Sequence, residues 1–98
     1  MTRQEIVVKD NLLEIGIPPS IHGFEYLTTA ILLYSNEVVL AGTKGLYAAI
    51  ALRYNTTASR VERAMRHAIA GSTYAGMPNR EFIATFHYKL RRAEALAQ

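Results

Sequence analysis

The chain has 98 residues, of which half are apolar and 19% are charged, and its net charge is +3. This composition predicts one folded domain with a single core and excludes a disordered chain. Cysteine is absent and the three histidines are scattered, so disulfides and thiolate metal sites are excluded and no metal or cofactor is expected.

Nearly every segment has helical periodicity, and none shows the alternation of a strand. The first helix is predicted to begin at a capping box, Thr2-x-x-Glu5, and to stop at Gly16 in a left-handed conformation. Its predicted inward residues are Ile6, Leu12, Leu13 and Ile15. Pro18-Pro19 then predicts an extended connection.

A second helix is predicted from about residue 23 to residue 34, with core residues at helical spacing: Phe24, Leu27, Ile31 and Tyr34. Val38-Val39-Leu40 is ambiguous, because it fits either a short strand or a buried helical turn. Gly42 and Gly45 mark a bend before the next helix.

The third helix is predicted near residues 46–53, with inward residues Tyr47, Ile50, Ala51 and Tyr54. Asn55 tolerates the left-handed conformation of a tight turn. Thr56 or Thr57 then caps the fourth helix, with Ser59-x-x-Glu62 as a second candidate box. One apolar stripe of that helix locks the pair together as a helix-turn-helix over about residues 45–70: Val61, Ala64, Met65 and Ala68.

Gly71 is predicted to close the fourth helix, and Asn79 is predicted to cap a last one. The apolar positions of the last helix recur every three to four residues: Phe82, Ile83, Phe86, Leu90 and Ala93. His87 and Tyr88 are expected to be packing or surface residues. The predicted fold is one all-α domain, residues 1–98, with about five helices around a helix-turn-helix and no winged strands.

Positive charge gathers in the second half of the chain. Residues 1–52 hold three Lys/Arg against five Asp/Glu, and residues 53–98 hold eight against three. On the fourth helix, Arg63 and Arg66 fall opposite the apolar stripe, Glu62 and His67 flank them, and Arg60 lies near the border. An arginine-faced second helix after a tight turn is typical of entry into the DNA major groove.

No segment resembles a signal peptide, and no apolar run reaches the roughly 18 residues of a membrane span, because Glu37 and Lys44 interrupt the most apolar region. We therefore expect a soluble, cytoplasmic protein.

The chain carries no Ser/His/Asp set, metal-ligand spacing or phosphate-binding glycine loop, so an enzyme is not expected.

Residues 55–69, NTTASRVERAMRHAI, resemble the recognition-helix segment of the C-terminal DNA-binding domain of the sporulation-initiation response regulator of endospore-forming bacteria. Residues 13–18, 23–27, 43–44, 46–47 and 81–84 resemble that domain in the same order. The resemblance implies an all-helical domain that binds a TGTCGAA-type promoter element. The positions that it places on the DNA-facing helix are Arg60, Glu62, Arg63, Arg66 and His67.

The implied partners are double-stranded DNA, a second protomer as a homodimer or in tandem on the DNA, and RNA polymerase.

The chain departs from the family in two ways that affect its expected function. The family joins this domain to a phosphate-accepting receiver, which is not present here, so phosphorylation control is not expected. The segment at 71–79 is shorter than the family's polymerase-contacting segment, so DNA binding carries over and activation does not.

The side chains of the predicted fourth helix, here called the reading helix, suit a DNA element that contains G and C. Arginine donates two hydrogen bonds to guanine O6 and N7, and glutamate accepts one from cytosine N4, so Arg60 or Arg63 is paired in this role with Glu62. The ordinary alternatives are a helical ion pair of Glu62 with Arg66, and arginines that simply form a solvated face.

Four residues, His67 among them, suit phosphate contacts, which fix register without reading sequence. Thr57 and Ser59 lie at the helix start, His67 lies about two turns further along, and Lys44 precedes the third helix; a plain surface lysine is an equal alternative for Lys44. We therefore expect a sequence-specific DNA-binding regulator that acts as a repressor or site competitor. The alternative is a helical interaction or dimerisation module that modulates another regulator.

Overall fold

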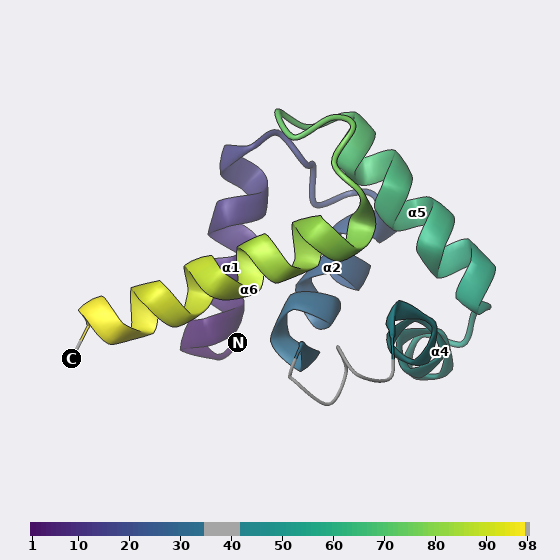
Figure 1. Cartoon of the computed structure of the whole chain (residues 1–98), viewed down its shortest axis with the longest axis horizontal. Helices are drawn as coiled ribbons and strands as arrows, with labels where there is room; N and C mark the ends of the chain where they lie inside the picture. The colour runs from purple at the N-terminus through teal and green to yellow at the C-terminus, as the bar shows by residue number, and fades with distance from the viewer. Residues whose placement is uncertain (35–41, 98) are drawn as a thin grey trace.

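The computed structural model describes residues 1–34 and 42–97, and within them it contains five α-helices and no strand (Figure 1). The helices are α1 (Arg3–Glu14), α2 (His22–Leu33), α4 (Thr43–Arg53), α5 (Ala58–Ala70) and α6 (Asn79–Leu96). The all-α prediction is therefore confirmed. The ambiguous run at 38–40 lies outside the described residues. None of the helices in the described ranges combines the length and apolarity needed to cross a bilayer.

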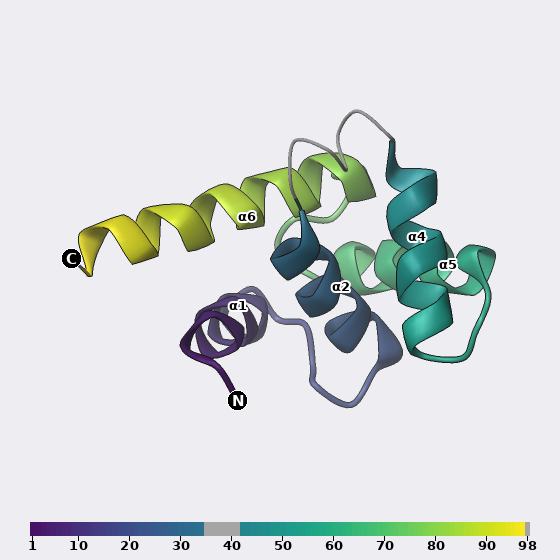
Figure 2. The ribbon, with the colours of Figure 1, turned by 90° about the horizontal axis from the view of Figure 1, so that it is seen from below.

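Helix α2 is the central element and contacts each of the four other helices. It lies between α1 on one side and the α4–α5 pair on the other, as both ribbon views show (Figure 2). This position explains its composition, because eight of its twelve residues are buried. Helix α6 packs on α1, α2 and α5, and residues of its second half, such as Leu90 and Glu94, lie next to α1. Its C-terminal end extends away from α4 and α5.

The two ends of α1 form as local sequence rules predict. The Thr2 side chain accepts a hydrogen bond from the Glu5 amide at 3.1 Å. Gly16 has φ +95°, and the amides of Gly16 and Ile17 donate to the carbonyls of Leu13 and Leu12, both at 3.0 Å. This is a Schellman arrangement, in which glycine supplies the left-handed residue at no steric cost.

The predicted inward face of α1 is partly wrong. Val8 and Leu12 are buried, whereas Ile6 and Leu13 are 45% and 48% exposed, and Ile15 is half-buried. Because Val8 and Leu12 are four residues apart, they form one stripe, and a 100° step per residue places Ile6 and Leu13 on the opposite side. Among the described helices, α2 and α6 make the main contacts with α1, and they cover this one stripe.

The apolar face of α6 is confirmed, with Phe82, Ile83, Phe86 and Leu90 buried. Phe82 and Phe86 stack with ring centroids 4.3 Å apart, and the Tyr74 ring meets both edge-on. The predicted cap of α6 is wrong, because Pro78 occupies the N-cap position and Asn79 is the first helical residue. Asn79 is buried, and its amide reaches two other helices.

Candidate nucleic-acid interface

The turn between α4 and α5 follows the backbone rules of a helix end. Asn55 has φ +54°, as predicted for this position, and it is the left-handed residue that stops α4. The Thr56 amide donates to the Ala51 carbonyl at 2.9 Å, and the Asn55 amide donates to the Leu52 carbonyl at 3.4 Å. The chain therefore leaves α4 in a defined direction and enters α5 after a short turn, as a helix-turn-helix requires.

Thr57 caps α5. Its side chain accepts a hydrogen bond from the Arg60 amide at 3.3 Å, which resolves the choice between the two threonines. The second candidate box is wrong, because Ser59 lies inside the helix and is exposed. Gly71 ends α5, as predicted. The structure thus confirms a 13-residue helix that begins directly after the turn.

The inner side of α5 packs closely on the rest of the protein. Val61, Met65, Ala68 and Ile69 are buried, and Ala64 is half-buried. At Gly23 the start of α2 comes so near to α5 that an added Cβ would lie 2.5 Å from the Ala64 carbonyl oxygen and 2.7 Å from the Ala68 Cβ. Because the contact is with backbone, α5 can sit at this distance only where residue 23 is glycine.

The outer side of α5 carries the predicted reading residues. Arg60, Arg63, Arg66 and His67 are all exposed. Glu62 is half-buried, and its carboxylate forms an ion pair with the Arg66 guanidinium at 3.0 Å. The ordinary helical alternative for Glu62 is therefore present in the free chain, while the three arginines stand outward on one face.

The phosphate candidates separate into two groups. Thr57 and Ser59 are exposed at the start of α5, and His67 is exposed in the last turn of the same helix. Lys44 is exposed in the first turn of α4, on the other helix of the pair. The structure therefore places the predicted residues on two adjoining helices and leaves all but Glu62 exposed.

Asn79 is a residue that the sequence did not single out for this site. Its Nδ2 donates to the Glu62 carbonyl oxygen at 3.1 Å and to the Tyr47 hydroxyl at 3.2 Å, so it joins the start of α6 to both α4 and α5. A second link joins α2 to the end of α4, where the Thr29 and Tyr54 hydroxyls are 2.7 Å apart. In the sequence, an asparagine that follows a proline looks like a helix N-cap. No local pattern indicates that the Asn79 side chain has hydrogen-bond partners 17 and 32 residues away.

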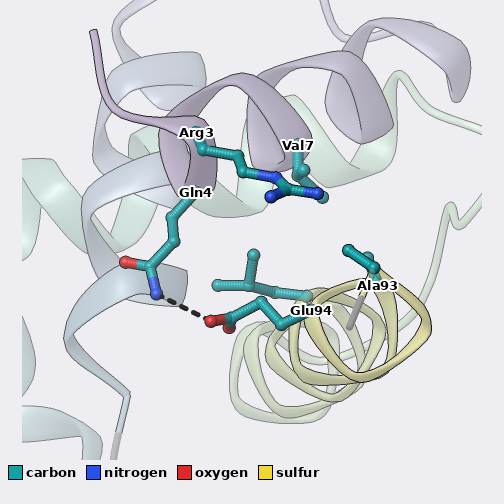
Figure 3. Close-up of a pocket in the computed structure, with 7 residues that line it drawn as sticks. Arg3, Gln4, Val7, Ala93 and Glu94 are labelled. Carbon is teal, nitrogen blue, oxygen red and sulfur yellow. Dashed lines mark hydrogen bonds between the residues drawn. The ribbon is translucent and has the colours of Figure 1, made fainter.

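A cleft between α1 and α6 lies apart from this interface. Figure 3 shows it lined by residues from the two helices, with Gln4 Nε2 donating to a Glu94 carboxylate oxygen at 3.1 Å. Arg3 and Ala93 line its other side. None of the predicted reading or phosphate residues takes part in it.

A helix-turn-helix whose second helix buries one stripe and exposes three arginines on the other side defines a class, the helix-turn-helix DNA-binding domains. Comparison with protein families narrows this class. The family described as sporulation initiation factor Spo0A C terminal matches residues 8–94. The chain belongs to this family, whose members are DNA-binding domains of a sporulation regulator. The resemblance drawn from residues 55–69 is therefore confirmed.

Proposed function

We propose that this chain is a sequence-specific double-stranded DNA-binding regulator that places α5 in the major groove. The observation that carries the proposal is the outward group of Arg60, Arg63 and Arg66 on a helix whose opposite stripe is buried. An α-helix fits the width of the major groove, and arginine recognises guanine there with two parallel hydrogen bonds. The family membership supports the same function.

In this proposal Arg60 or Arg63 reads guanine and Glu62 accepts from cytosine N4. Glu62 must then leave its ion pair with Arg66. That change costs little, since the Arg66 side chain is 65% exposed and pairs of this kind contribute about 0.3–0.5 kcal/mol. A TGTCGAA-type element offers both bases, and it is the target that we propose.

Phosphate contacts complete the proposed interface. Thr57 and Ser59 hold the start of α5, His67 lies about two turns along, and Lys44 contacts the backbone from α4. Hydrogen bonds to phosphate fix the register of the protein on the duplex and carry no sequence information. We therefore expect loss of these side chains to weaken binding to all duplexes alike.

A gel-shift comparison tests the reading role. Duplexes that carry the TGTCGAA element or its scrambled version are titrated with the wild-type chain, with Arg63→Ala and with Arg92→Ala. Arg92 is also an exposed arginine and lies near the far end of α6, so it is the control. We expect Arg63→Ala to lose about 1–3 kcal/mol on the element, a factor of about 5–150, and the control to lose little. Equal losses from both variants would contradict the proposal.

We further propose that the chain represses transcription or competes for sites of the family, alone or as tandem protomers. The support is the short connection between α5 and α6, residues 71–78, which offers little surface for a polymerase contact. In a reporter assay the chain should lower transcription from a promoter that carries the element. Clear activation would show instead that this chain contacts RNA polymerase productively.

Exposed apolar side chains favour one alternative, an interaction or dimerisation module. Leu52 on α4 and Leu96 on α6 are 86% and 76% exposed. Sedimentation of the free chain together with the gel shift separates the two functions. Self-association without measurable DNA affinity at low salt would favour the module, and element-dependent binding by a monomeric free chain would exclude it.

A further inference from the structure

Two shallow grooves border α5, one along each flank of its outer face. The first lies between α5 and the start of α2, and it is lined by Arg63 and His67 on one wall and by His22 on the other. The second lies between α5 and the start of α6, and it is lined by Arg66 on one wall and by Arg80 on the other. Each groove thus pairs residues of α5 with a hydrogen-bond donor from another helix, His22 from α2 or Arg80 from α6.

The geometry of a DNA duplex determines what faces the outer walls of the two grooves, the walls formed by His22 and Arg80. The major groove is about 12 Å wide, and an α-helix with its side chains is about 10–12 Å across. A helix in that groove therefore has a phosphodiester backbone along each flank. The outer wall of each protein groove faces one of the two strands when α5 reads the bases.

Both walls offer groups that bind phosphate, because the Arg80 guanidinium is positively charged and the His22 ring carries an N–H donor. His22 and Arg80 are both exposed, and neither takes part in an ion pair among the described residues. Glu62 is the acidic side chain in the second groove; it is paired with Arg66 at 3.0 Å in the free chain, and in the proposed complex it turns to cytosine, away from the phosphates. The acidic neighbour of Arg80, Glu81, does not line the groove.

We propose that His22 and Arg80 contact the two phosphodiester strands that flank the reading helix, one strand each. This inference rests on the proposed function and extends its interface to α2 and α6, which carry none of the reading residues. In this arrangement the recognition helix is held between two backbone contacts, and the register of α5 along the groove depends on both.

The test measures affinity against salt concentration, from about 50 mM to about 200 mM, for the element and its scrambled version. The chains are the wild type, Arg80→Ala, His22→Ala, and Arg92→Ala as the distal control. We expect Arg80→Ala to reduce the slope of log affinity against log salt by about 1 and to weaken both duplexes by the same factor. His22→Ala should weaken both duplexes about equally, and Arg92→Ala should match the wild type.

The outcomes separate this inference from the proposed function. An unchanged slope and affinity in Arg80→Ala would overturn the contact from α6, and unchanged affinity in His22→Ala would overturn the contact from α2. Either result can occur while the wild type still prefers the element and Arg63→Ala still loses that preference. A wild-type chain that binds neither duplex at low salt would overturn both proposals. A thermal melt of each variant accompanies the titration, since a merely structural residue would lower Tm and leave the salt slope unchanged.

Discussion

Replacing Asn79 tests how strongly the start of α6 holds the helix-turn-helix. Asn79 as a whole residue is 9% exposed, and Asn79→Ala removes its side-chain donations to the Glu62 carbonyl and the Tyr47 hydroxyl. Each hydrogen bond contributes about 0.5–1.5 kcal/mol net. The Glu62 carbonyl keeps its acceptor role inside α5, and the half-buried Tyr47 retains access to water, so no further penalty for an unpaired group is added. We expect a loss of about 1–3 kcal/mol in the free energy of unfolding.

Urea unfolding followed by circular dichroism measures this loss, and Asn79→Asp is the informative companion. Aspartate has nearly the same shape as asparagine, but it has no N–H group to donate and carries charge into a buried position. If the amide acts as a donor, Asn79→Asp should destabilise more than Asn79→Ala. The reasoning is refuted if Asn79→Asp is as stable as the wild type, or if the alanine variant is the less stable of the two.

Three other substitutions probe the position and chemistry of α5. Gly23→Ala should destabilise by about 1–3 kcal/mol in urea unfolding, because the new Cβ meets the Ala64 backbone; wild-type stability would show that α2 and α5 separate freely. Asn55→Ala should lower the free energy of unfolding by about 1–2 kcal/mol, measured by thermal unfolding, because alanine is strained at φ +54°. Asn55→Gly should lower it much less, because glycine adopts this conformation without strain. Glu62→Gln should strengthen binding to the scrambled duplex and reduce preference for the element in a gel shift. If that preference is unchanged, Glu62 serves only its pair with Arg66.

The features that could be predicted are those that neighbouring residues decide. Gly16 and Asn55 adopt their left-handed conformations because few other residues do so without strain, and Thr57 caps α5 because its hydroxyl satisfies a free amide three residues on. The arginine face of α5 was likewise predictable, since a strong helical period separates it from the buried stripe. These signals lie within a few residues of the feature that they specify.

The features that could not be predicted depend on which helix covers which. Ile6 and Leu13 are apolar, yet they lie on the uncovered side of α1, and only the positions of α2 and α6 reveal this. Asn79 follows a proline as a cap would, but the packing of α4 and α5 buries it and supplies its acceptors. His22 and Arg80 become neighbours of the reading helix only through tertiary packing.

The distribution of charge, more than its sum, decides how such a chain recognises DNA. A net charge of +3 is small, but the proposed interface gathers Arg60, Arg63 and Arg66 on one face, with Arg80 beside them. Each phosphate that is neutralised adds about 0.9 to the salt slope, so a few basic side chains predict a shallow slope and weak non-specific binding. Discrimination by base contacts must therefore supply most of the occupancy at a target site. Two contacts hold α5 in place: the close approach of Gly23 to the Ala64 backbone and the hydrogen bond from the Asn79 amide to the Glu62 carbonyl. Such a fixed helix favours base recognition, because rigid placement of the reading side chains limits the entropy lost on binding.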